Sequence, residues 1–337
     1  MAYKEFEEGK IRLGSPKKKG KGAPSYIRPK KKNPYAGSGG GVARIQRLVK
    51  RAPEVMVKVS GNTRGYSHMK EHLNYITRNG ELVGETGSGA LIEGRDDVKS
   101  LADEWFRRRE VVVGDRQRGA KETVNMVFSM PAGTDREKVR QATAKAVTEL
   151  IADRHDYILV EHRDTAQPHV HVTVLARGRA GERYNPRKAD LQALRDGFAH
   201  ELRALGVEAE STPRKMRGIV RKPQRQVLRH LEMREPSKVQ RSKVEEAVSV
   251  IKGLVEKGER PWEEATKNQQ TKIRQQWKGL SERFFGEGGE GKTLAGEINR
   301  FLESMPLIKT EREILESSLT SRIEKNKKDS SDKNADK

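Results

Sequence analysis

The stretch VEHRDTAQPHVHVTVL, Val160–Leu175, constrains the fold of this chain more than any other part of the sequence. Apolar, β-branched runs at Tyr157–Val160 and Val170–Leu175 are typical of strands. The segment between them, Arg163–Pro168, is polar and ends in a proline. The simplest connection between two such strands is a tight antiparallel hairpin, so we predict that the folded domain is built around this pair.

Three of the eight histidines lie in this stretch. In the predicted hairpin His162 is opposite His169, and His171 is a diagonal neighbour on the same face, because side chains alternate along a strand. Three imidazoles that converge in this way can hold a divalent cation and leave positions open for a substrate. An H-x-H pair alone is a weak sign of a metal, but the spacing H-x-D-x4-H-x-H across two paired strands is seldom accidental. Asp164, on the face of His162, would either hold a ligating histidine in its tautomer or act as a base.

The composition indicates the class of partner. The formal charge of +21 and a pI near 10.0 favour a polyanion, nucleic acid first, although ribosomal and membrane-surface proteins share this signature. Cysteine is absent, which excludes disulfides, thiolate metal sites and a cysteine nucleophile. No apolar run approaches the length of a membrane span or a signal-peptide core, so we expect a cytoplasmic protein without membrane insertion.

Composition also divides the chain into five parts. Residues 1–50 are rich in Lys and Arg and include the run GSGGG, which predicts a disordered basic arm. Residues 51–212 carry the regular patterns of a folded domain. Beyond them we expect a basic strap or linker interrupted by prolines at residues 213–241, a small helical accessory region at residues 242–325, and a polar tail at residues 326–337.

The folded domain is predicted to be α+β, an antiparallel sheet with flanking helices. Besides the hairpin, the patterns predict strands and helices in alternation along the chain. The strands are expected at Val55–Ser60 and Thr123–Met130, and the helices at Asp96–Arg109, after a capping box Thr134-x-x-Glu137, and at Ala189–Leu205.

One more helix is predicted after the first strand. Its buried stripe is Met69, Leu73 and Ile76, and Asn79-Gly80 ends it. At 3.6 residues per turn Tyr75 lies on the flank, away from that stripe. A half-exposed tyrosine in such a place usually has no special role.

The predicted site favours chemistry on a phosphate. Three neutral imidazoles with no carboxylate ligand would leave a divalent metal strongly electrophilic, which suits it to polarise a phosphate. In a strongly basic protein the expected substrate is a phosphodiester of DNA or RNA. The nucleophile would be water or a side chain, and without cysteine the side-chain candidates are hydroxyls.

Three segments resemble a known family. HRDTAQPHVHV at residues 162–172 resembles the third motif of conjugative relaxases, which are HUH endonucleases, and HLNYITRNGEL at residues 72–82 resembles their first motif. VNMVFSMPAGTD at residues 124–135 is also similar to these mobilization nucleases, most closely to the branch that contains the T-DNA border endonucleases. The resemblance covers roughly residues 55–215.

The resemblance implies a site and a fold. It makes Tyr75 the nucleophile, Asp164 a supporting carboxylate, and His162, His169 and His171 the ligands of a divalent metal ion, for which we expect Mg²⁺ or Mn²⁺. It also implies a sheet of about five antiparallel strands.

The resemblance implies a biological role as well. Single-stranded DNA would be nicked at the transfer origin of a plasmid or mobile element, and the enzyme would stay on the 5′ end. The expected partners are this DNA, an accessory origin-binding protein and the coupling protein of a type IV secretion system, with export of the joined enzyme during transfer.

Two other functions remain open. A rolling-circle replication initiator or an HUH transposase would use similar histidines, but many such initiators carry a second tyrosine four residues after the first, where this chain has Asn79. A non-enzymatic DNA-binding protein with a structural metal would form no covalent adduct. It would also need a saturated metal site, which three histidines alone do not supply.

Overall fold

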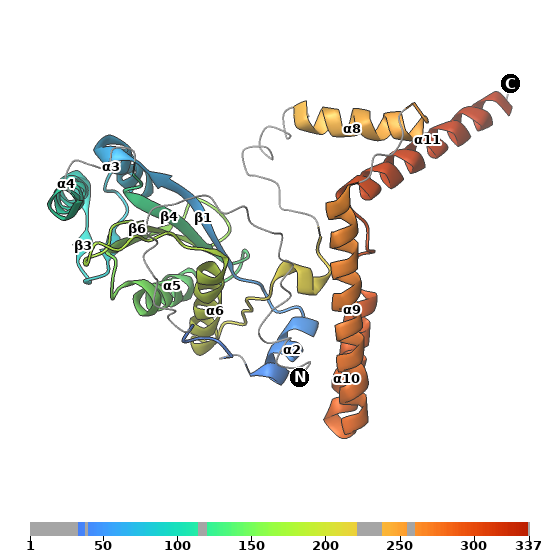
Figure 1. The fold of residues 1–337 in the computed structure, drawn as a ribbon, viewed down its shortest axis with the longest axis horizontal. Helices are drawn as coiled ribbons and strands as arrows, with labels where there is room; N and C mark the ends of the chain where they lie inside the picture. The colour runs from blue at the N-terminus through green and yellow to red at the C-terminus, as the bar shows by residue number, and fades with distance from the viewer. Residues whose placement is uncertain (1–32, 38–39, 114–119, 221–237, 255–259, 336–337) are drawn as a thin grey trace. The chain divides into compact units, whose positions relative to one another are not determined.

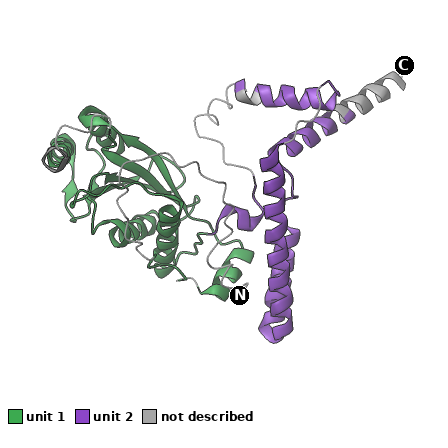
Figure 2. Ribbon diagram, in the orientation of Figure 1, with its two compact units in different colours: residues 1–211 green, residues 212–337 purple. Residues whose placement is uncertain are grey.

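The structure is a computed structural model that describes residues 33–37, 40–113, 120–220, 238–254 and 260–335. The chain forms two compact units, residues 1–211 and residues 212–337 (Figure 2). The division falls at the start of the segment that composition predicts to be a basic strap. Each unit is described by itself.

Unit 1 is α+β, as predicted, and its sheet is antiparallel with the order β1-β4-β6-β5-β2-β3 (Figure 1). In the described residues the sheet has six strands rather than about five. The two strands that the sequence did not reveal, β2 and β3, have only three and two residues. The strands are β1 Met56–Thr63, β2 Gly84–Thr86, β3 Leu91–Ile92, β4 Thr123–Ser129, β5 Tyr157–His162 and β6 His169–Leu175.

The predicted hairpin is formed by β5 and β6, next to each other in the interior of the sheet. His162 pairs with His169, and Val160 pairs with His171, which is the predicted register. Because side chains alternate along a strand, the three histidines lie on one face of the sheet. Val170, Val172 and Val174 of β6 lie in the core on the other face.

Helices cover both faces of the sheet (Figure 1). Helices α5 (Arg136–Ile151) and α6 (Lys188–Ala204) bury the larger apolar core, while α3 (Gly65–Ile76) and α4 (Gly94–Val113) bury the smaller one on the face of the histidines. Helix α3 presents the predicted stripe to the sheet. Its members are all fully buried: Met69, Leu73 and Ile76.

Two predicted helix boundaries are wrong. Helix α3 stops at Ile76, before the Asn79-Gly80 pair expected to end it. Helix α5 is capped by Asp135, whose side chain accepts a hydrogen bond from the Lys138 backbone N–H, so the capping box beginning at Thr134 does not form. The Thr134 hydroxyl donates to the Pro131 carbonyl instead, which closes the turn before the helix.

The basic arm is also shorter than predicted. Gly41–Val49 forms helix α2, which buries Ile45 and Leu48. Its Arg44 and Arg47 pair with Glu210, which is only 2% exposed. The prediction of disorder is therefore wrong for this helix, and residues 1–32 lie outside the described part of the chain.

Unit 2 is helical, as expected for its accessory region. Helices α9 (Pro261–Glu287) and α10 (Gly289–Glu303) form a hairpin (Figure 1). Trp277 on α9 is fully buried, packs edge-on against Phe301 and donates its indole N–H to the Met216 carbonyl. Residues 326–335 of the predicted polar tail continue the last helix, and most of the predicted strap, residues 221–237, lies outside the described residues. The helices are α8 Lys238–Ile251, α9 Pro261–Glu287, α10 Gly289–Glu303 and α11 Glu311–Ala335, with a short 3₁₀ helix at Arg214–Arg217.

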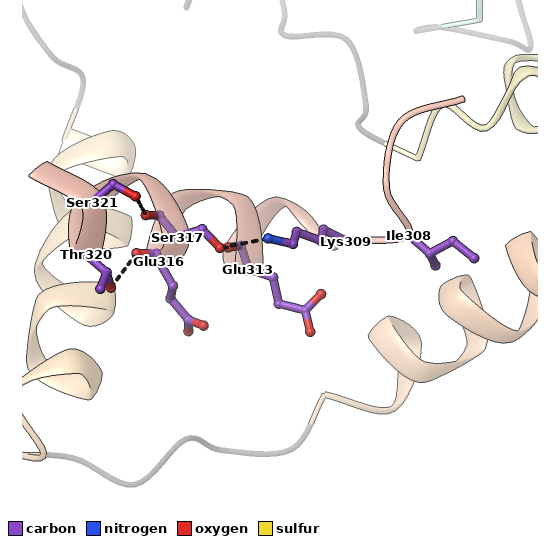
Figure 3. Close-up of a pocket in the computed structure, with 7 residues that line it drawn as sticks. All are labelled: Ile308, Lys309, Glu313, Glu316, Ser317, Thr320 and Ser321. Carbon is purple, nitrogen blue, oxygen red and sulfur yellow. Dashed lines mark hydrogen bonds between the residues drawn. The ribbon is translucent and has the colours of Figure 1, made fainter. Parts of the chain in front are cut away.

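A surface hollow lies along α11 in unit 2 (Figure 3). Its charged groups already have partners, since Lys309 donates to the Ser317 hydroxyl and Glu313 pairs with Lys267. It contains no histidine and no aromatic residue, and we assign it no function. Its lining residues are Ile308, Lys309, Glu313, Glu316, Ser317, Thr320 and Ser321. Among the described helices, none combines the length and the apolar character needed to cross a bilayer.

Candidate active site

His162, His169 and His171 converge on the sheet face next to α3, and we call them the histidine cluster. Their ring centroids are 4.1 to 5.4 Å apart. One potential ligand atom from each lies within 4.8 Å of the others. The hairpin thus brings together the three residues that the sequence predicted would meet.

Hydrogen bonds orient two of these rings for a cation. Nε2 of His162 lies 2.7 Å from the carbonyl of Ile76, and Nδ1 of His169 lies 3.1 Å from the carbonyl of Gln167. A carbonyl oxygen only accepts, so each of these nitrogens carries the proton. The opposite nitrogen of each ring keeps its lone pair, which is the form that a metal ligand requires.

Burial favours the uncharged form of two of these histidines. It lowers the pKa of His162, and it lowers the pKa of His171 to about 3 with help from the neighbouring imidazoles. Neutral imidazole is the ligating form, so these residues fit a divalent cation at neutral pH.

Tyr75 stands beside the cluster at the end of α3. Its ring centroid lies 6.4 Å from that of His162 and 6.3 Å from that of His171. The side chain is 57% exposed, as expected for the helix flank opposite the buried stripe. A phenol in this position is open to a substrate from solvent and close to any cation that the histidines hold.

Residues 75–203, which include Tyr75 and the whole histidine cluster, match a family described as relaxase, MobA/VirD2-like, nuclease domain. This part of the chain is a relaxase nuclease domain. No individual curated protein matches the chain. The resemblance inferred from the sequence motifs is thereby confirmed for the domain, and the domain makes the chain an endonuclease.

Two roles were predicted for Asp164: to hold a ligating histidine in its tautomer or to act as a base. The structure does not place Asp164 for the first of these roles. Its carboxylate accepts a hydrogen bond of 2.6 Å from Arg78 and is 51% exposed. The Arg78 guanidinium lowers the pKa of this carboxyl. The carbonyls of Ile76 and Gln167, rather than Asp164, orient the histidines.

Sequence reasoning missed three residues that shape the site. Arg78 lies over the Tyr75 ring, with its Cζ 5.0 Å from the ring centroid. Arg136, on α5, donates a hydrogen bond to the His162 carbonyl and so helps to fix the end of β5. His72, one turn before Tyr75, bonds the Thr173 hydroxyl at 2.9 Å, and burial lowers its pKa to about 4.

Little in the sequence pointed to these roles. Arg78 lies inside the motif HLNYITRNGEL, but its direction depends on a turn whose backbone conformation the letters do not reveal. Arg136 and His72 act through contacts with distant strands. Their positions alone gave no signal.

Tyr66, at the start of α3, has a different place in unit 1. Its hydroxyl donates to Asp103 on α4, and its ring packs edge-on against Phe106. Tyr66 therefore belongs to the contact between α3 and α4. It lies on another side of α3 from the histidine cluster.

Proposed function

We propose that this chain is a metal-dependent DNA nickase that cleaves single-stranded DNA at a transfer origin and uses Tyr75 as its nucleophile. The observation that carries this proposal is the exposed Tyr75 phenol beside three converging imidazoles in a relaxase nuclease domain. A bound divalent cation, Mg²⁺ or Mn²⁺, would polarise the scissile phosphate as a Lewis acid.

The chemistry is a transesterification. The Tyr75 oxygen forms a bond to phosphorus, the bond from phosphorus to the 3′ oxygen breaks, and the phenol proton passes by way of solvent to the departing 3′-hydroxyl. The 5′ end stays on the enzyme as a phosphotyrosine. The number of phosphoester bonds is unchanged, so the reverse attack reseals the strand without an energy source.

Burial and hydrogen bonding support Tyr75 over the other tyrosines. Among the tyrosines that the structure describes, it alone is exposed. The hydroxyls of the other four are each engaged with another side chain in the domain: those of Tyr35, Tyr66, Tyr157 and Tyr184. Tyr3 and Tyr26 lie outside the described residues.

The arrangement after α3 disfavours an initiator with two tyrosines on one helix. The helix ends at Ile76, and Asn79 lies in a left-handed turn beyond it. We therefore keep conjugative mobilization as the proposed role, with an accessory origin-binding protein and a secretion coupling protein as proposed partners. The enzyme would work in the cytoplasm and leave with the transferred strand.

The test is an adduct assay on a denaturing gel. Labelled single strands of candidate transfer origins, incubated with the protein and Mn²⁺ or Mg²⁺, should give a protein–DNA band that survives denaturation. Tyr75→Phe should abolish that band without loss of DNA binding, and Tyr66→Phe should keep it. A Tyr75→Phe variant that still formed the band would refute the assignment.

A further inference from the structure

The turn after α3 has an unfavourable backbone conformation. Arg78 and Asn79 both have positive φ angles, 52° and 58°, and Gly80 follows with φ 88°. Side chains with a Cβ atom adopt this left-handed region at a cost, whereas glycine adopts it freely. The chain nevertheless has arginine at position 78. Such local strain is often found at functional sites.

The surrounding structure fixes this turn. The Thr77 hydroxyl donates to the Leu73 carbonyl at 2.8 Å and accepts the Gly80 backbone N–H at 3.2 Å. Gly80 lies so close to the backbone of Gly94 that an added Cβ would come within 2.2 Å of it. The direction in which Arg78 leaves the backbone is therefore set by packing.

From this turn the guanidinium of Arg78 reaches back over the nucleophile. One nitrogen donates to the Tyr75 carbonyl at 3.1 Å and another to Asp164 at 2.6 Å. The planar group also covers the Tyr75 ring at 5.0 Å from its centroid. Arginine suits this role because its rigid fork can donate in two directions while its face stacks on an aromatic ring.

These contacts join the two segments that must cooperate. Arg78 follows the nucleophile, and Asp164 lies in the loop between the metal-binding strands. The ion pair ties this loop to the turn, and the bond from His162 to the Ile76 carbonyl makes a second tie between the same segments. Interactions with Asp164 and with the Tyr75 phenol both raise the pKa of Arg78.

We propose that Arg78 is a positioning residue that holds the Tyr75 ring against the histidine cluster, and that Asp164 acts through Arg78. Asp164 is then neither the base of the reaction nor the orienter of a histidine. This inference rests on the proposed function, because it assumes that Tyr75 attacks DNA.

A purely structural role would have a different signature. Arg78 and Asp164 are 34% and 51% exposed, and ion pairs at such exposure contribute little to stability. Arg78→Gly would also relieve the left-handed strain. The variant should therefore unfold at the same temperature as the wild type or higher, while its chemistry becomes slower.

The experiment uses the full chain and a labelled single strand on which the wild type forms the tyrosine adduct. The rate of adduct formation is measured at saturating DNA for Arg78→Gly, Asp164→Asn and the double variant. DNA affinity is measured for the same changes in a Tyr75→Phe background. Arg163→Ala is the matched control, because Arg163 is an exposed arginine next to Asp164 that pairs with Glu161 and does not touch Tyr75.

Loss of positioning should lower the rate about 10- to 100-fold in each single variant. The double variant should be no slower than the slower single variant, because both changes break the same unit. DNA affinity and bound metal should stay at their wild-type levels, and no variant should unfold at a lower temperature than the wild type. Arg163→Ala should react at the wild-type rate.

Four outcomes would overturn the inference. They are a wild-type rate in Arg78→Gly, a loss of DNA affinity that accounts for the slower reaction, a parallel fall in unfolding temperature, and an Asp164→Asn effect that persists in full in the Arg78→Gly background. The last result would make Asp164 an independent participant, such as a base. If the wild type forms no adduct on any origin strand, the proposed function itself fails.

Discussion

Replacing Glu210 with glutamine is expected to release helix α2 from the relaxase domain. The buried carboxylate accepts hydrogen bonds from Arg47 Nε at 3.0 Å and from the Ser211 backbone N–H at 2.9 Å, and it forms an ion pair with Arg44 Nε at 3.3 Å. A glutamine has the same size, but its NH₂ group cannot accept a hydrogen bond. One arginine would then face a donor, and both would lose the negative charge at position 210, although Arg44 keeps the Asp196 carboxylate at 3.9 Å.

These contacts give the size of the expected loss in the free energy of unfolding. A hydrogen bond to a charged group contributes about 1.5–3 kcal/mol and a neutral one about 0.5–1.5 kcal/mol. The difference between a charged and a neutral contact is counted once for each arginine and reduced, because Arg44 and Arg47 keep 27% and 19% of their side chains exposed. The sum is about 2 kcal/mol. In a domain of about 150–250 residues this lowers the melting temperature by about 4–8 °C.

The assay combines thermal unfolding with limited trypsin digestion. Arg44 and Arg47 are themselves trypsin sites on α2, so release of the helix should speed cleavage after them. Glu208→Gln is the control, because Glu208 is exposed and two residues away. An unchanged melting temperature and unchanged cleavage in Glu210→Gln would refute the view that this ion cluster docks α2.

Two more predictions concern the cation and the arm. Mn²⁺ at about 100 times its dissociation constant should stabilise the wild type by about 2.7 kcal/mol. His169→Ala or His171→Ala should remove this stabilisation and the nicking while the fold persists. An equal stabilisation in both variants would place the cation elsewhere. Deletion of residues 1–32 should weaken binding to all single strands alike and flatten its salt dependence, because lysine-rich segments neutralise phosphates rather than read bases. A change in the preferred nicking sequence would show that the arm reads bases.

The hairpin and its histidines were predictable because they depend on a period of two. Once β5 and β6 were recognised, alternation fixed which residues share a face, and a turn over residues 163–168 fixed the register. The buried stripe of α3 was predictable for the same kind of reason, since apolar residues recur at helical spacing. These patterns are local, because they depend only on residues that are close together in the sequence.

What the sequence did not reveal depends on tertiary contacts. Strands β2 and β3 are too short to carry a pattern, and β2 is fixed by its pairing with β5, where Gly84 leaves room for Ile158. The role of Arg78 requires the left-handed turn that aims it. The carbonyl of Ile76 that orients His162 is a backbone group. Every residue has such a group, so nothing in the sequence indicated its role.

The proposed function requires that Tyr75 becomes covalently joined to DNA. The direct measurement is mass spectrometry of the protein after reaction with an origin strand, nuclease trimming and proteolysis. We expect one modified peptide, with the nucleotide-derived phosphate on Tyr75. A modification on any other tyrosine, or cleaved DNA with no modified peptide, would contradict this proposal.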